Sequence, residues 1–205
     1  MNHLAHAWLA RHSDAAILGA MLGDFAHGPI ETLPWPPAVR DEIRRHRQID
    51  RLTDTHPAVV DARALFPDGQ RRFAGIVLDV YFDHLLARDW WSWNGAAADA
   101  PLLEDFAARV YRVLLDNLAA LPPRLQAIAP RMAAHDWLGG MRHRGNVERT
   151  VRAIAARLSR GGDTLIACAQ DLPCHEATVD SAFKQLLPAL VAELDPAVSE
   201  SRART

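Results

Sequence analysis

Apolar residues recur every three or four positions along most of the chain, which is the spacing of one face of an α-helix. No segment alternates apolar and polar residues as a half-buried strand would, and no repeat of fixed period is present. The pattern therefore predicts an all-α fold. The expected helices cover residues 2–11, 14–26, 37–54, 71–91, 102–121, 124–134, 146–160 and 176–194, with a short helix that ends at 66.

Capping and helix-breaking residues set the ends of these elements. Ser13 is an expected N-cap for the second helix, which Gly28-Pro29 should end. The third helix should end at His56-Pro57, because the residue before a proline disfavours the helical conformation. A turn is expected at 67–69, and a loop or hinge at the glycine pair 161–162.

Length and composition fit a protein with a real core. With 205 residues, of which 49% are hydrophobic, the chain is long enough to bury one. We expect a single-domain helical bundle over residues 1–195, with a motif-bearing core in 1–91, a helical second half in 102–195 and a polar tail in 196–205.

Charge and hydropathy exclude several classes of protein. The formal net charge is only -2, so a nucleic-acid binder that works through bulk positive charge is not expected. No apolar run approaches the roughly 18 residues of a membrane span, and no signal peptide is apparent, so we expect a cytoplasmic protein. Cys168 and Cys174 are too few for a disulfide framework and are expected to be ordinary thiols.

The helix expected over residues 37–54 carries polar side chains where core residues belong. At roughly 100° per residue, Val39 and Ile43 define its inward face. His46, Asp50 and Thr53 fall within about 40° of that face. Burying an unpaired carboxylate is so costly that Asp50 needs a cation, a hydrogen-bond network or a metal ion as its partner.

Three more helices each direct a histidine or a carboxylate inward. Asp24 lies on the inward side of the second expected helix, and His6 lies on the apolar face of the first. On the helix that begins at Arg71, His84 lies near the middle of the apolar arc, with Asp83 at its edge. Asp79 precedes Asp83 by one turn, so the two carboxylates are neighbours.

Each of these residues also has an ordinary structural explanation. A lone inward His6 would most often be a hydrogen-bonded core histidine, and Asp50 could be neutralised by an arginine. Asp54 and Asp79 could be solvated or paired with the arginines of the same region. One or two divalent ions would instead satisfy the whole set together, which consists of Asp24, His46, Asp50, Asp83 and His84.

The donor types restrict the metal and its chemistry. Nitrogen and oxygen ligands without thiolate suit manganese, iron, magnesium or zinc, and the many carboxylates favour manganese or magnesium. Such an ion polarises a phosphoryl oxygen and activates water, so phosphoester hydrolysis is the predicted reaction. Arg47 and Arg51 leave the helix beside the site, where a guanidinium would match phosphate oxygens, although either could equally be an exposed helix charge.

Taken together, the motifs resemble the acyl carrier protein phosphodiesterase family. The matching stretches are MNHLAH at 1–6, GDF at 23–25, HRQID at 46–50 with TD at 53–54 and HP at 56–57, and LDVYFDHLL at 78–86 with Trp90. Trp137-Leu138 and the basic helix after it continue the likeness more loosely. That family looks like a divergent branch of the HD-domain metal-dependent phosphohydrolases.

The resemblance implies an all-helical, HD-domain-like hydrolase that depends on Mn²⁺, with Mg²⁺ or Fe²⁺ as alternatives. It implies removal of 4'-phosphopantetheine from holo acyl carrier protein to give the apo form. The residues to which it assigns a metal or catalytic role are Asp24, His46, Asp50, Asp79, Asp83 and His84, with His6 close by. An HD domain has adjacent His and Asp, whereas here three residues separate His46 from Asp50, so the ligands of each metal stay open.

The expected mechanism is attack of metal-activated water on the phosphodiester, with Arg47 stabilising the charge that develops on phosphorus. The leaving serine needs a proton, for which His6, His84 or water on the metal is the candidate general acid. Carrier proteins as a class are acidic, so the substrate should dock on a basic surface. The arginines that would provide it are Arg142, Arg144, Arg149, Arg152, Arg157 and Arg160, although a solvated helix face is equally consistent with them.

Two other functions stay open at this point. An HD-type phosphohydrolase could act on a nucleotide or another small phosphoester without a carrier protein. A non-catalytic helical binding protein could use the buried histidines and aspartates as a structural network. The sequence leaves the oligomeric state and the number of metal ions undetermined.

Overall fold

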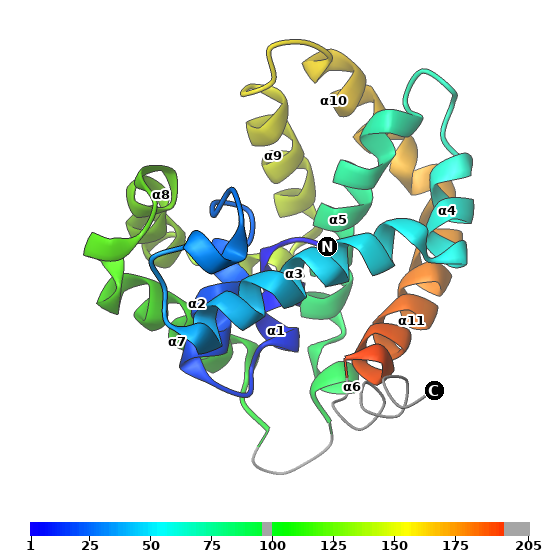
Figure 1. Cartoon of the computed structure of the whole chain (residues 1–205). Helices are drawn as coiled ribbons and strands as arrows, with labels where there is room; N and C mark the ends of the chain where they lie inside the picture. The colour runs from blue at the N-terminus through cyan, green and yellow to red at the C-terminus, as the bar shows by residue number, and fades with distance from the viewer. Residues whose placement is uncertain (96–99, 195–205) are drawn as a thin grey trace. The chain divides into compact units, whose positions relative to one another are not determined.

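The protein is described here by a computed structural model, shown in Figure 1, in which residues 1–95 and 100–194 are described. No strand occurs among these residues, which confirms the predicted all-α fold. The likeness to an HD domain stays a prediction.

Helices follow one another along the chain with short connections between them. The α-helices are α1 (His3–Leu9), α2 (Asp14–Leu22), α3 (Pro37–Thr55), α4 (Pro57–Ala64), α5 (Arg71–Arg88), α6 (Trp90–Asn94), α7 (Leu103–Asp116), α8 (Pro123–Ala134), α9 (Arg144–Ala155), α10 (Gly162–Asp171) and α11 (Glu176–Glu193). Short 3-10 helices are η1 (Ile30–Thr32), η2 (Leu118–Ala120), η3 (Gly139–Arg142) and η4 (Leu172–His175).

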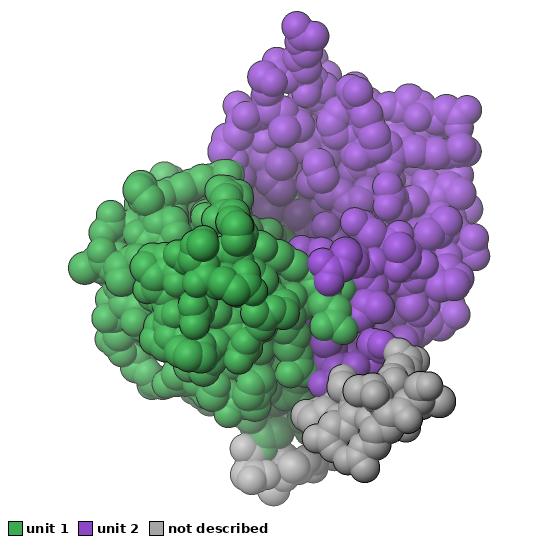
Figure 2. Space-filling model, in the orientation of Figure 1, with its two compact units in different colours: residues 1–48, 81–147 green, residues 49–80, 148–205 purple. Residues whose placement is uncertain are grey.

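The helices gather into two compact units, coloured separately in Figure 2. Unit 1 comprises Met1–Gln48 and Tyr81–Val147, and unit 2 comprises Ile49–Val80 and the described residues from Glu148 onward. The boundaries fall inside α3, α5 and α9, so neither unit is one continuous stretch of chain. The expected single domain over 1–195 stays a prediction.

Unit 1 is built around α2. This helix packs against α1 and α7, and α7 packs against α8. Ser13 caps α2 as predicted, because its Oγ accepts the Ala16 N–H at 3.1 Å. Gly19 lets α2 lie close to α3, since a Cβ at this position would be 2.5 Å from the carbonyl oxygen of Val39.

Unit 2 joins segments from distant parts of the sequence. Helices α4 and α11 pack against each other and lie side by side in Figure 1. Their buried faces include Val59 and Ala62 on α4 and Val179 and Phe183 on α11. Apolar residues at helical spacing thus meet across this pair, as the sequence pattern requires.

Three predicted helix ends were wrong. The helix predicted over 14–26 ends at Leu22, and the chain turns at Gly23 and Asp24. The helix predicted over 102–121 ends at Asp116, because the Asn117 side chain donates to the Val113 carbonyl and closes the last turn. The helix predicted over 146–160 ends at Ala155.

The segment at the glycine pair agrees in part with expectation. The loop predicted at 161–162 is confirmed at Gly161, which lies outside the helices as the N-cap of α10 with a φ of 83°, whereas Gly162 already begins α10. A residue with a side chain would adopt this left-handed conformation poorly. The helix predicted over 71–91 divides at Asp89 into α5 and α6.

Among the described residues, no helix combines the length and the apolar character that crossing a membrane would require.

Candidate functional site

His46 lies on α3 and is buried, as its place on the helical wheel predicted. Its Nδ1 is 2.9 Å from the carbonyl oxygen of Ala20. Because a carbonyl can only accept, Nδ1 must carry a hydrogen there. The other ring nitrogen, Nε2, lies 3.4 Å from Oδ1 of Asp24. A neutral His46 would thus turn a lone pair toward a carboxylate, an arrangement that a proton or a metal cation between them makes favourable.

Asp24 follows α2 and is not on an inward helix face, which corrects the prediction. The helix ends at Leu22, and the Asp24 side chain is 46% exposed. Its Oδ2 lies 3.4 Å from Nδ1 of His3, so both oxygens face imidazoles. Desolvation would by itself raise the pKa of Asp24. The hydrogen bond with His46 and the charges of the histidines outweigh it and hold that pKa well below its usual range.

His6 completes this cluster from α1. Its side chain is buried, and its ring stacks on that of His46 with centroids 3.7 Å apart and planes 14° from parallel. The neighbouring His3 ring stacks on Phe25 at 6.1 Å. Three histidines and one carboxylate from three segments of unit 1 therefore meet at the end of α2.

Gly23 makes room for the His46 ring. A Cβ on Gly23 would lie 2.1 Å from Cγ of His46, far inside any real contact distance. Its φ of -51° is one that any residue adopts, so the lack of a side chain matters here for space alone. The prediction of site residues missed Gly23, although the GDF stretch contains it.

Asp50 follows His46 by one turn on the same uninterrupted helix α3. A carboxylate oxygen of Asp50 and a ring nitrogen of His46 lie within 4.8 Å of each other, and so do ligand atoms of His46 and His6. Two imidazole nitrogens and a carboxylate at these distances are compatible with a divalent metal ion. Thr53, the third polar residue predicted on this face, is buried.

Asp83 is buried on α5 and holds the start of α1. Its Oδ2 accepts the Leu4 N–H and its Oδ1 accepts the Ala5 N–H, each at 2.9 Å. Both donors belong to the first turn of a helix, where backbone N–H groups lack partners within the helix. Asp83 therefore positions the helix that carries His3 and His6.

His84, next to Asp83, has the same hydrogen-bond pattern as His46. Its Nδ1 lies 2.7 Å from the carbonyl oxygen of Met141, so that nitrogen carries a hydrogen. The ring is buried and packs beside Tyr81 with centroids 5.4 Å apart. A histidine whose Nδ1 is fixed on a backbone carbonyl presents Nε2 as a metal ligand or proton carrier.

Asp79 belongs to unit 2 and is separated from Asp83 by one turn of α5. Burial raises its pKa, and the like charges of Asp50 and Asp54 raise it further. Asp54 itself pairs with Arg63 at 3.5 Å, and not with an arginine of its own helix. Within unit 2, the carboxylates of Asp50 and Asp79 are therefore electrostatic neighbours.

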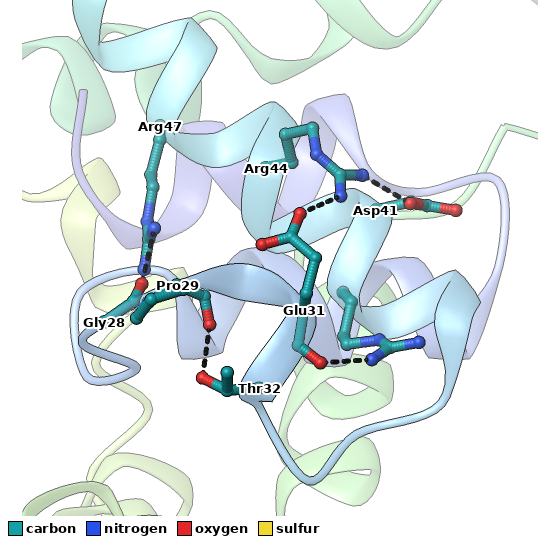
Figure 3. Close-up of polar contacts among 8 residues, drawn as sticks. Gly28, Pro29, Glu31, Thr32, Asp41, Arg44 and Arg47 are labelled. Atoms are coloured by element: carbon teal, nitrogen blue, oxygen red, sulfur yellow. Dashed lines mark hydrogen bonds and ion pairs between the residues drawn. The ribbon is translucent and has the colours of Figure 1, made fainter.

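Arg47 uses its guanidinium on the backbone after α2. The Nη2 group donates to the Ala26 carbonyl at 2.8 Å. Nη1 donates to the Gly28 carbonyl at 3.1 Å, and this bond is drawn in Figure 3. In the same view Arg44 lies between Asp41 and Glu31. The arginines of α3 therefore fix the segment that follows Asp24, and the predicted phosphate-binding role of Arg47 stays a prediction.

The predicted basic surface includes two arginines that already have partners. Arg142 pairs with Glu104 and lies 3.9 Å from Asp136. Arg144 lies over the ring of Tyr81, with its guanidinium carbon 4.9 Å from the ring centroid. Arg149 and Arg152 are exposed on α9.

Glu42 is a buried carboxylate that the sequence analysis did not single out. It lies one turn before His46 on α3 and is 4% exposed. Its Oε1 has no hydrogen-bond partner among the described residues. Desolvation raises the pKa of Glu42 to about 6, although Arg45 and His46 partly oppose this.

Comparison with known proteins gives a single answer. A family model described as acyl carrier protein phosphodiesterase matches residues 1–190. An acyl carrier protein phosphodiesterase of Escherichia coli O157:H7 (strain EC4115 / EHEC) is 34% identical over 94% of this chain and 97% of its own length. The protein of the same name from Enterobacter sp. (strain 638) is 34% identical over the same shares of the two chains.

The protein of that name from Escherichia coli (strain K12 / DH10B) is 33% identical, again over 94% of this chain and 97% of its own. No solved structure matches the chain. The predicted resemblance, first based on short motifs, is thus confirmed over nearly the full length. The chain belongs to the acyl carrier protein phosphodiesterase family.

Proposed function

We propose that this protein hydrolyses the phosphodiester that joins 4'-phosphopantetheine to holo acyl carrier protein, with a divalent metal ion as cofactor. Membership of the family supports the reaction. The observation that carries the site is His46, whose Nδ1 is bound to Ala20 while Nε2 faces Asp24. This is the orientation of a histidine that ligates a metal or relays a proton.

His46 and Asp50 on α3 would hold the ion, with His6 and Asp24 completing the donor set. The fit rests on donor chemistry, because imidazole nitrogen and carboxylate oxygen without thiolate suit Mn²⁺, Mg²⁺ or Fe²⁺. When bound, such an ion polarises the phosphoryl group and activates water. Asp79, Asp83 and His84 retain the metal or catalytic roles that the resemblance implies.

The substrate would approach at Asp24, the exposed member of the cluster. His46 and His3 hold the two Asp24 oxygens from either end, which orients the carboxylate toward the reacting group. The leaving serine oxygen needs a proton, which His6 or His84 would donate as a general acid. The products are apo carrier protein with a free serine hydroxyl, and 4'-phosphopantetheine, which keeps the phosphate.

The substrate protein would dock through charge. Carrier proteins are acidic, and the exposed Arg149 and Arg152 of α9 supply positive charge. Because the whole chain carries a net charge of only -2, attraction between the two proteins must come from local groups such as these.

The test is the mass of purified holo carrier protein after incubation with this protein and manganese. We expect metal-dependent loss of the phosphopantetheine mass, which a chelator and the His46→Ala variant both abolish. His27→Ala serves as the matched control, because His27 is exposed and lies outside the cluster. An unchanged mass with folded, metal-loaded wild-type protein would overturn the proposal, and hydrolysis of small phosphoesters alone would favour an HD-type phosphohydrolase.

A further inference from the structure

The ring of Phe25 links the candidate site to an arginine from a distant part of unit 1. Phe25 directly follows Asp24, and its ring stacks on His3, whose Nδ1 contacts Asp24. The guanidinium carbon of Arg124, on the first turn of α8, lies 5.8 Å from the centroid of the Phe25 ring. An unbroken series of contacts therefore runs from the Asp24 carboxylate to the Arg124 guanidinium.

Arg124 differs from Arg47 in what its guanidinium already binds. Arg47 donates to the carbonyls of Ala26 and Gly28. Within residues 1–95 and 100–194, the Arg124 guanidinium lies over the Phe25 ring and makes no hydrogen bond or ion pair with a carboxylate or a carbonyl. Contact with an aromatic face restricts the position of a guanidinium but leaves its N–H donors available.

We infer that Arg124, held on Phe25, is the arginine that binds the phosphate of the substrate. The inference rests on the proposed function and deepens it, because it names the residue that recognises the phosphodiester. A planar guanidinium with its donors free matches two phosphate oxygens at once. Through Phe25 and His3 this guanidinium is linked to Asp24, whose side chain is the solvent-exposed member of the cluster.

This assignment separates phosphate recognition from docking of the carrier protein. Holo carrier protein bears the phosphodiester, and apo carrier protein does not, while both present the same acidic surface. A residue that binds phosphate therefore affects the holo form alone. A residue that binds acidic side chains of the carrier affects both forms equally.

The experiment measures kcat and KM for holo carrier protein, and the inhibition constant of apo carrier protein as a competitive inhibitor. Loss of a charge-assisted bond costs about 1.5–3 kcal/mol, so Arg124→Gln should lower kcat/KM roughly 10- to 100-fold. The inhibition constant of apo carrier protein should stay within twofold of wild type. Arg124→Lys keeps the charge but loses the forked pair of donors. Its kcat/KM should therefore lie between the values of wild type and Arg124→Gln.

Arg131→Gln is the matched control, because Arg131 is exposed on the same helix and the substitution removes the same charge. Its kcat/KM should equal that of wild type. Wild-type kcat/KM in Arg124→Gln would overturn the inference, and an equal loss of affinity for the apo and holo forms would reassign Arg124 to docking. If wild-type protein itself fails to turn over holo carrier protein, the proposed function fails first, which is a separate result.

Discussion

His46 depends on the backbone around it as much as on its own imidazole. The Ala20 carbonyl fixes which ring nitrogen carries the hydrogen, and Gly23 leaves the space in which the ring lies. Stacking on His6 fixes the plane of the ring. The role proposed for His46 therefore depends on neighbours that include a backbone carbonyl and a glycine.

Gly23→Ala is expected to displace the His46 ring, because the new methyl group would occupy space 2.1 Å from Cγ. Displacement breaks the bond to Ala20 and the alignment with Asp24, and misplacement of a reacting group by about 1 Å can cost roughly 100-fold in rate. We expect kcat/KM on holo carrier protein to fall by about that factor. Gly145→Ala should leave it unchanged, since nothing lies within 4 Å of a Cβ there. Full activity of the Gly23 variant would show that the ring position is not critical.

Glu42 gives a prediction about stability and pH. Its pKa is raised to about 6 in the folded protein from an ordinary value of 4.5, so the folded state binds this proton more tightly. The protonated Glu42 carboxyl stabilises the folded state fully below about pH 4.5. This stabilisation is lost as the pH rises through about 6. Glu42→Gln cannot ionise, so at pH 7 to 8 it should raise the free energy of unfolding by about 2 kcal/mol.

The measurement is denaturant unfolding of wild type and Glu42→Gln across this range. The gain should shrink toward zero as the pH falls to about 4.5. Glu31→Gln is the control, because Glu31 is exposed and its pKa is lowered through a backbone hydrogen bond and the Arg44 guanidinium. A gain that is independent of pH would mean that ionisation of Glu42 is not its cause.

Helix α1 is the element that most depends on a distant side chain. It has only seven residues, and its N-cap Asn2 makes no side-chain capping bond. Asp83 of α5 takes over this role and accepts two first-turn N–H groups. A helix this short is marginal on its own, so its position follows that of its tertiary partners.

Asp83→Asn tests whether this residue serves α1 or a metal. Losing one charge-assisted bond and weakening the other should lower the free energy of unfolding by about 2–4 kcal/mol. If Asp83 acts through α1, the loss should be equal in chelator and in manganese. A loss that appears only in the metal-loaded protein would instead identify Asp83 as a ligand. Asp105→Asn, on an exposed position of α7, should have no effect in either condition.

The whole protein should respond to metal as a unit that binds only when folded. At a free Mn²⁺ concentration 100 times the dissociation constant, binding stabilises the folded state by about 2.7 kcal/mol. For a chain of this length that corresponds to a rise in Tm of roughly 5–10 °C. His46→Ala should abolish the rise and His27→Ala should keep it, as measured by calorimetry. Equal rises in both variants would mean that the ion binds elsewhere.

The exposed arginines of α9 give a prediction about docking of the carrier protein. Arg149→Glu with Arg152→Glu should raise KM for holo carrier protein about 10-fold and weaken its dependence on ionic strength, because long-range attraction is screened by salt. Arg112→Glu with Arg131→Glu introduces the same charge change at exposed positions of α7 and α8 and should leave KM unchanged. Unaltered kinetics in the α9 variant would exclude that surface as the docking site.

The sequence by itself determined the class of fold and the polar residues of the interior. Helical periodicity gave the all-α architecture, and the helical wheel correctly placed His6, His46 and His84 among buried residues. These features depend on the spacing of residues along one helix, which the chain order contains. Family membership was also predicted from short motifs of the chain, and the full-length comparison confirmed it.

Only the tertiary structure decided what those side chains bind. The helix predicted over 14–26 ends at Leu22, before Asp24. The exposure of Asp24 and its contacts with two histidines were therefore not predicted. Arg47 was expected beside phosphate, yet its donors meet two backbone carbonyls. The physical reason is that backbone carbonyls and glycine spaces leave no periodic signal. Their positions become available to a distant side chain only when helices pack against one another.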